Sequence, residues 1–209
     1  MTTTYNQIAG KSLERLSALS DGVFAVAMTL LVLDLRAPAD AAIQSEGDLV
    51  AALLALAPHV ITYGMSFLML GILWVGQQTG LGFLVRSDRD HTWLQIAFLA
   101  TVTLLPFSTA VLSEFHEYRT ALLIYWGNLV LCGSVLYAAW MHAKHGGLLK
   151  PDVPPEALRA LERRILIGQV LYALGAALCV FGTWYSIAFI VAVQLNYAIA
   201  PRIKPLSSL

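Results

Sequence analysis

The sequence from Ile165 to Ala200 contains no charged side chain, and this run constrains the fold more than any other feature. A helix that crosses about 30 Å of hydrocarbon needs roughly 20 mostly apolar residues. The run is too long for one crossing, so we expect two membrane spans joined by a tight turn near Gly182. Only 12% of all residues are charged, whereas soluble domains average about 25%, which also indicates a bilayer protein.

Four more apolar segments precede this run. The sequence therefore predicts an all-α, polytopic membrane protein with six transmembrane helices per chain. The expected spans are approximately 15–35, 49–77, 92–112, 120–141, 165–182 and 183–200. Pro58 lies inside the second segment and should kink or tilt that helix. No soluble domain or cleavable signal is evident, so residues 1–209 are predicted to form one transmembrane domain.

The basic residues predict the orientation. Eleven fall in the N-terminal segment, in the loops after spans two and four, and in the C-terminal segment: Lys11, Arg15, Arg86, Arg89, Lys144, Lys150, Arg159, Arg163, Arg164, Arg202 and Lys204. Only Arg36 and Arg119 fall on the alternate side. Because Lys and Arg accumulate in cytoplasmic loops, we expect both termini in the cytoplasm and a multi-pass protein of the cell membrane.

The loop after the first span is acidic. It contains Asp34, Asp40, Glu46 and Asp48 against a single arginine. Such a loop either concentrates cations at an outer mouth or is an ordinary solvated loop, and the sequence leaves both interpretations open.

The first span contains an ionisable group. Asp21 follows Ser20 in an otherwise apolar helix, and an ionised Asp at mid-membrane costs roughly 2.5–3.5 kcal/mol on insertion scales. Such a residue is a functional candidate and must find partners on neighbouring helices. We therefore expect Ser20 and Asp21 to anchor this helix inward.

The same helix has an apolar stripe on its other side. At 100° per residue, Leu30, Leu33 and Thr29 lie within about 60° of Val26, whereas Asp21 lies about 140° away. The stripe could face lipid or another helix. If several copies met around an axis, it would instead form stacked apolar rings with Thr29 as the polar step, and apolar constrictions gate ion flow by dewetting.

Arg15, Leu19-Ser20-Asp21 and the apolar helix up to Asp34 resemble the bacterial branch of the transmembrane protein 175 family of potassium channels. The family pattern is an Arg, three residues and then Phe-Ser-Asp. Further agreement extends over the first three spans: Tyr63-Gly-Met-Ser66-Phe67, Gly71-Ile-Leu-Trp74, Trp93 and Pro106-Phe-Ser-Thr109. The last three spans agree only in hydropathy and number.

The resemblance implies a homotetramer around a central pore lined by the first helix. The constriction or gate would fall on Val26, Leu30 and Leu33, with Thr29 as the polar residue that lines the pore. The motif and its anchoring network would comprise Arg15, Leu19, Ser20, Asp21, Gln77, Gln78, Trp93 and Gln95.

The chain departs from the family pattern at five positions. Leu19 replaces the motif's Phe, Gln77-Gln78 replaces a pair of His residues, and Gln95 replaces an Asn. Gln still donates and accepts hydrogen bonds but does not titrate. Val26 is smaller than the family's Ile or Leu, which favours a wider neck.

These observations predict a passive, potassium-permeable channel that is weakly selective for K⁺ over Na⁺. The sequence contains no Thr-Val-Gly-Tyr-Gly filter that could select ions by carbonyl rings. The expected partners are identical subunits, the lipid bilayer, and K⁺ with other monovalent cations, without nucleic acid.

The sequence does not predict an enzyme. It has no nucleophile–base pair or metal motif, its five His residues are dispersed, and no cofactor or metal is expected. A secondary transporter usually shows internal repeats, and none is found here. A structural membrane subunit remains the other alternative.

Overall fold

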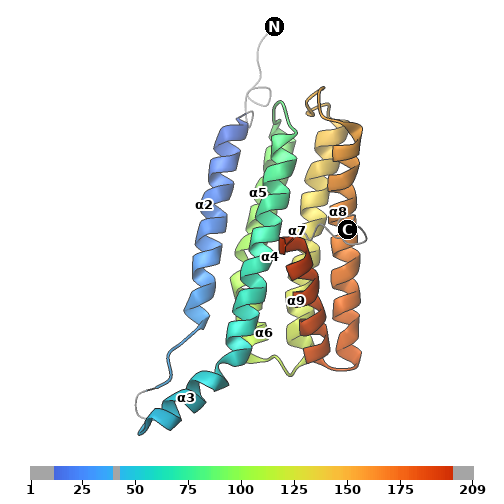
Figure 1. Cartoon of the computed structure of the whole chain (residues 1–209). Helices are drawn as coiled ribbons and strands as arrows, with labels where there is room; N and C mark the ends of the chain where they lie inside the picture. Colours follow the sequence, from blue (N-terminus) through green and yellow to red (C-terminus); the bar gives the residue numbers. More distant parts are fainter. Residues whose placement is uncertain (1–11, 40–42, 200–209) are drawn as a thin grey trace.

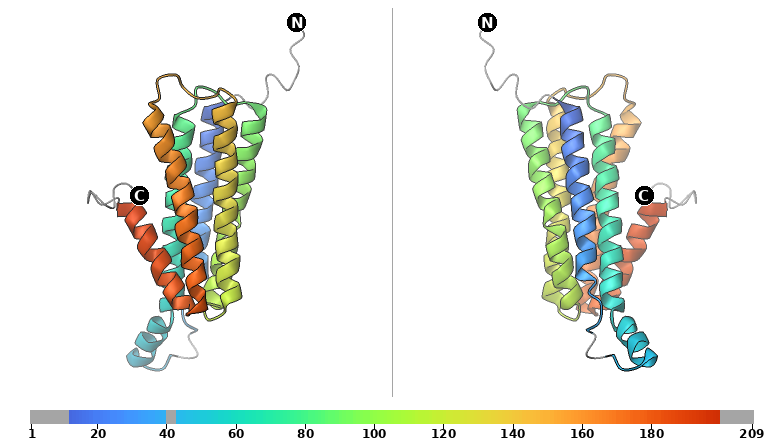
Figure 2. Two further views of the ribbon diagram at one scale, coloured as in Figure 1. Left: turned by 90° about the vertical axis from the view of Figure 1, so that its right-hand side faces the viewer. Right: turned by 90° about the vertical axis from the view of Figure 1, so that its left-hand side faces the viewer.

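The computed structural model describes residues 12–39 and 43–199. The described chain is helical, and its only β-type pairing is an isolated bridge between Leu84 and Leu149. Most helices run side by side as an elongated bundle (Figures 1 and 2). The elements are α2 (Leu13–Leu31), η1 (Val32–Asp34), α3 (Glu46–Ala55), α4 (Ala57–Gly82), α5 (Arg89–Thr103), α6 (Leu105–Glu114), α7 (Arg119–His145), α8 (Pro155–Ala177), η3 (Leu178–Val180) and α9 (Thr183–Ile199).

Within residues 12–39 and 43–199, five stretches are long and apolar enough to cross a membrane. They are Leu13–Asp34, Ala57–Gly82, Arg89–Glu114, Arg119–His145 and Pro155–Val180. The predicted all-α class with multiple membrane-crossing helices is therefore confirmed. The sixth predicted span corresponds to α9, which has 17 residues, fewer than the roughly 20 that a crossing needs. Its predicted last residue, Ala200, lies outside the described residues.

Proline divides the second predicted span. We expected one kinked helix over 49–77, but α3 ends at Ala55 and α4 begins at Ala57, with Pro58 in its first turn. A proline nitrogen cannot donate to the preceding turn, and its ring clashes with the carbonyl four residues earlier, so the helix restarts there. No residue of α3 is buried, and this helix projects from the end of the bundle (Figure 1). The membrane-crossing part therefore begins at Ala57 and continues to Gly82.

The third span is also divided. Leu104 separates α5 from α6, and Pro106 lies in the first turn of α6. The sequence analysis did not predict this break, although the same proline chemistry explains it. Together the two helices still form a continuous stretch from Arg89 to Glu114.

A glycine makes the predicted turn in the uncharged run. Gly182 has φ +152°, a conformation that L side chains rarely adopt. It lies between η3 and α9, so α9 folds back along α8 and contacts α4 (Figure 2). The tight turn expected near Gly182 is present.

The two ends of the bundle differ in charge. Towards the end where α2, α5 and α8 begin, eight basic residues are found in loops, at helix ends and in the first half of α8: Arg15, Arg86, Arg89, Lys144, Lys150, Arg159, Arg163 and Arg164. We call this the basic end. Arg36 and Arg119 lie at the opposite end, and Lys11, Arg202, Lys204 and Asp40 lie outside the described residues.

Two hairpins are tied together at the basic end. The Val85 amide donates to the Leu148 carbonyl at 2.9 Å, and the Lys150 amide donates to the Phe83 carbonyl at 2.9 Å. A small apolar cluster that includes Leu16 fills the space beneath them. The main core extends along the bundle and holds the buried face of α2 against α4, α5 and α6.

Candidate functional site

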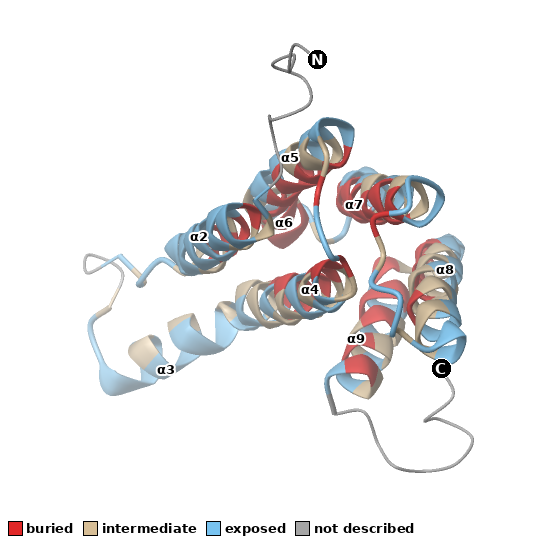
Figure 3. Cartoon of the chain, turned by 90° about the horizontal axis from the view of Figure 1, so that it is seen from above, coloured by how far each residue is buried: buried red, intermediate tan, exposed pale blue. Residues whose placement is uncertain are grey.

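The first membrane helix, α2, has two faces. Its buried residues follow helical spacing, namely Leu16, Ser20, Phe24, Ala27 and Leu31. Figure 3 shows α2 at the edge of the bundle with most of its surface exposed. This placement follows from the sequence, because apolar residues at intervals of three and four bury one stripe of a helix and leave the other free.

The predicted pore stripe lies on the exposed side. Val26 is 57% exposed, Leu30 46% and Leu33 68%. The stripe is therefore not buried against its own subunit. Of the interpretations given above (lipid, another helix, or copies of the chain around an axis), packing against a helix of the same chain is excluded. Contiguous exposed apolar surface marks a contact with a membrane or with another protein chain. The stripe therefore contacts either lipid or a second copy of the chain.

Thr29 is the polar member of this exposed side. Its hydroxyl donates to the Val26 carbonyl at 2.9 Å within the same helix. That bond satisfies the hydroxyl proton in an apolar surrounding and leaves the oxygen able to accept another bond or to contact a cation.

A chain of hydrogen bonds holds the buried side of α2 near the basic end. The Ser20 hydroxyl donates to Gln77 Oε1 of α4, and Gln77 Nε2 donates to Gln95 Oε1 of α5 at 2.9 Å. Gln95 Nε2 lies 3.3 Å from His91 Nε2, and His91 Nδ1 lies 2.9 Å from the Ser87 hydroxyl. All five side chains are buried. The donor direction leaves His91 Nε2 as acceptor and places its proton on Nδ1.

Asp21 makes a second set of contacts at the surface of the bundle. Its Oδ1 accepts from Trp74 Nε1 at 2.8 Å and from Gln78 Nε2 at 2.9 Å. Gln78 Oε1 in turn accepts from the Ser17 hydroxyl at 3.0 Å. Two donors from α4 thus meet the carboxylate of α2, as a charged group at membrane depth requires.

Three members of the predicted network lie elsewhere. The side chain of Arg15 is exposed and has no hydrogen-bond or ion-pair partner among residues 12–39 and 43–199; only its backbone amide is bound, by the N-cap hydroxyl of Ser12. Leu19 and Trp93 are exposed, 49% and 59% respectively. Within one chain, the structure therefore groups Ser20 and Asp21 with the three glutamines but not with these residues. Their anchoring roles stay predictions.

Several side chains of these hydrogen-bond networks, namely Ser17, Trp74 and His91, were not among the predicted site residues. Ser17 and Ser20 lie on adjacent turns of α2, and Trp74 precedes Gln77 and Gln78 by one turn. This spacing was a usable signal, because residues three or four apart share a helix face. His91 precedes Gln95 by four residues, so the same spacing places these two side chains on one face of α5.

A carboxylate–imidazole pair lies beside this network. Asp88 caps α5, since its Oδ1 accepts from the His91 amide at 2.7 Å, and its two oxygens lie 3.1 and 3.0 Å from His142 Nε2 of α7. Partial burial raises the pKa of Asp88, but the hydrogen bonds from His91 and His142 outweigh it, so that pKa lies below its ordinary value. Asp88 and His142 are 54 residues apart in the sequence, so only the packing of α7 against the start of α5 brings them together. No group of three His, Cys, Asp or Glu residues in the described part of the chain could hold a metal ion.

These features define a multi-pass helical membrane protein whose first helix combines an exposed apolar stripe with a polar anchor. Residues 15–106 match the family described as endosomal/lysosomal potassium channel TMEM175. A potassium channel of Chamaesiphon minutus is 30% identical over 189 residues, which cover 88% of this chain and 93% of that protein. A potassium channel of Streptomyces collinus is 35% identical over 170 residues, which cover 78% and 81% of the two chains.

A solved structure agrees with the sequence comparisons. The crystal structure of a lysosomal potassium-selective channel TMEM175 homolog from Chamaesiphon minutus matches with a TM-score of 0.79 and 27% identity, covering 91% of this chain and 98% of that one. The chain belongs to the TMEM175 family, and its relatives are ion channels rather than enzymes. The resemblance identified from the first three spans is confirmed, and the alignments extend it over most of the chain.

Proposed function

We propose that four copies of this chain assemble around a central axis as a potassium-permeable channel, with α2 of each copy lining the pore. The observation that carries this proposal is the opposite orientation of two features on α2. Ser20 and Asp21 bond to α4 on one side, while Val26, Leu30 and Leu33 are left exposed on another. A helix held in this way presents an apolar stripe that its own subunit does not cover, and membership of a channel family supports a pore as its destination.

In this proposal, the stripe forms a hydrophobic neck. Rings of Leu30 and Leu33 would lie beyond the Val26 ring, and Thr29 would supply the one polar step. An ion passing such a neck loses water without receiving carbonyl ligands, since the sequence has no carbonyl-ring filter. Selectivity for K⁺ over Na⁺ would then come from the lower dehydration cost of K⁺ and would be modest.

The proposed topology has six spans with both termini in the cytoplasm of a cell-membrane protein. The basic end would face the cytoplasm, because eight basic residues lie there against two at the other end. At 1.5 Å per residue, the 17 residues of α9 extend about 25 Å. A tilted or locally thinned bilayer accommodates that length at modest cost.

A flux assay tests the ion path. The protein is reconstituted into potassium-loaded liposomes without ATP or a coupled ion. The wild-type protein should dissipate the gradient, and Val26→Asn or Leu30→Asn should accelerate the leak because an amide in the neck favours water there. The matched control is Val170→Asn on α8, because Val170 is 58% exposed, as Val26 is 57% exposed, but lies on another helix.

The results separate the alternatives. If Val26→Asn and Val170→Asn have the same flux as the wild type at equal protein levels, the stripe does not line the path. A gradient that dissipates only with a second, coupled ion would indicate a secondary transporter instead. Reversal potentials in mixed K⁺ and Na⁺ would then measure selectivity.

A further inference from the structure

Two hollows follow the outer surface of α4 and meet end to end. The first, about 760 Å³, lies between α2, α4 and the C-terminal part of α9, and the second, about 730 Å³, lies between α4 and the first half of α8. Val75 and Arg164 line both. The hollows therefore form one groove along α4, from the level of Phe67 to that of Phe83.

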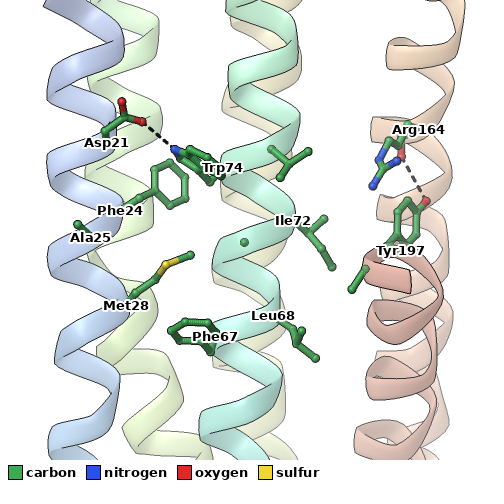
Figure 4. A pocket seen from close by; sticks show the side chains of 13 residues that line it. Asp21, Phe24, Ala25, Met28, Phe67, Leu68, Ile72, Trp74, Arg164 and Tyr197 are labelled. Atoms are coloured by element: carbon green, nitrogen blue, oxygen red, sulfur yellow. Dashed lines mark hydrogen bonds between the residues drawn. The ribbon is translucent and has the colours of Figure 1, made fainter. Parts of the chain in front are cut away.

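The half of this groove away from the basic end is apolar. Its walls include Phe24 and Met28 of α2 and Phe67, Leu68 and Ile72 of α4 (Figure 4). The eight steps of the helix from Phe67 to Val75 rise about 12 Å at 1.5 Å each. One leaflet contributes about 15 Å of the 30 Å hydrocarbon core, so this half has the length of the acyl region of one leaflet.

The half nearer the basic end is positively charged. Arg159, Arg163 and Arg164 line it, with Glu156 as the one acidic residue. None of the three arginines forms an ion pair with another part of the described chain. The guanidinium carbon of Arg164 lies 4.8 Å from the ring centroid of Tyr197, and Figure 4 shows the two side chains next to each other. Because Arg164 lines both hollows, it lies where the two halves meet.

We propose that this groove binds one anionic phospholipid of the leaflet at the basic end, with its phosphate among the three arginines and an acyl chain along α4. Basic pockets between membrane helices recognise anionic headgroups in this manner. Arginine is also suited to phosphate, because its planar guanidinium offers paired donors. Asp21 lines the groove from α2, across α4 from Arg164 (Figure 4), so the negative headgroup is directed towards α8.

Charge also argues against the protein's own C-terminal segment as the occupant. Residues 200–209 contain Arg202 and Lys204 and no acidic side chain. Such a segment would bring like charge to the arginines. The groove lies on helices apolar enough to cross a membrane, so lipid is the medium that surrounds it.

The headgroup contacts are tested by native mass spectrometry of the purified full-length protein titrated with phosphatidylglycerol. The triple variant Arg159→Gln/Arg163→Gln/Arg164→Gln should bind this lipid about 100-fold more weakly, since each basic residue near a membrane surface contributes about a fivefold factor. The double variant Arg86→Gln/Arg89→Gln removes exposed arginines from the same end but outside the groove, and should bind as the wild type does. Equal loss in both variants would overturn the proposal.

The acyl contact is tested by filling the apolar half. A Cβ atom at Gly71, which lines the groove, or at Gly64, which does not, would meet no heavy atom within 4 Å. Both Gly71→Leu and Gly64→Leu should therefore fold. Gly71→Leu should weaken lipid binding at least tenfold, whereas Gly64→Leu should leave the lipid affinity unchanged. If glycerophosphoglycerol, the soluble headgroup, binds as tightly as the lipid and Gly71→Leu has no effect, the site is an anion site only. If the arginine and Gly71 variants lower the mass of the oligomer but leave the lipid affinity unchanged, the groove is a contact between subunits. Either of these two outcomes refutes the proposed lipid site.

Discussion

The hydrogen bonds of Gln77 allow a stability prediction to be worked out in detail. Gln77 is 1% exposed and joins three helices, because it accepts from Ser20 of α2 and donates to Gln95 of α5. Gln77→Leu keeps the approximate volume of the side chain but removes both bonds. The two partners then respond differently, which sets the expected loss of stability.

In this variant the Ser20 hydroxyl can form a replacement hydrogen bond, whereas Gln95 Oε1 cannot. A helical serine hydroxyl can donate instead to the backbone carbonyl four residues earlier. The stability lost with the Ser20–Gln77 bond is therefore limited to about 0.6 kcal/mol, the average for an interhelical hydrogen bond in a membrane. Gln95 Oε1 keeps no donor among its other contacts in the described structure, and a buried orphaned acceptor costs about 1–3 kcal/mol. We therefore expect Gln77→Leu to lower the free energy of unfolding by about 2–3 kcal/mol.

The measurement is equilibrium unfolding in bilayer-mimicking bicelles, with Ser20→Ala and the double variant completing a mutant cycle. Ser20 and Gln77 should show a coupling energy of about 0.6–1.7 kcal/mol. The matched control is Gln194→Leu in α9: Gln194 is fully buried, and its polar neighbour, the Tyr125 hydroxyl, keeps its bond with Ser66 when the amide is removed. If Gln77→Leu costs no more than Gln194→Leu, or the coupling is zero, the network does not hold α2.

Three further predictions concern single positions. Gly175→Ala places a Cβ 2.9 Å from an Ile side chain of α9, so it should lower the free energy of unfolding by about 1–3 kcal/mol. Gly71→Ala, whose Cβ would meet open space, should change the free energy of unfolding by less. Equal effects of the two variants would contradict this prediction. Asp21→Ala removes the acceptor of two α4 donors and should lower the tetramer fraction in size-exclusion chromatography, and an unchanged fraction would refute it. The pKa of Asp88 is lowered on folding, so its bond to His142 should stabilise the protein fully above the usual carboxyl pKa of about 4 and progressively less as the pH falls through the lowered folded-state pKa. The melting-temperature advantage of the wild type over Asp88→Asn should therefore shrink steadily on acidification below about pH 4, and an advantage that does not change with pH would contradict this prediction.

The sequence could predict most of the fold because bilayer crossing depends on length and hydropathy alone. The apolar segments, their helical class and the turn at Gly182 all follow from this constraint. The boundaries near Pro58 and Pro106 were less predictable. Proline can kink, tilt or restart a helix, and neighbouring helices decide which of these occurs.

The candidate site was predictable only in part, for a similar reason. The helical angle placed Val26 and Asp21 on different sides of α2, because angular position is a local property. Partner choice is not local. The packing of α4 brings Trp74 to Asp21 and Gln77 to Gln95, whereas the Arg15 side chain has no partner within the described chain.

The polar anchor also explains how one helix can keep an apolar stripe turned away from its own core. Apolar packing alone specifies the rotation of a membrane helix weakly, because lipid is as apolar as a neighbouring Leu. A rotation of α2 by one residue, or 100°, would carry Ser20 away from Gln77 and break the buried bond. The same rotation would move Asp21 away from Trp74 and turn Val26 to a different surface. The hydrogen bonds near the basic end therefore fix the rotation of the whole helix, and the α2 residues that form them, Ser20 and Asp21, lie off the stripe.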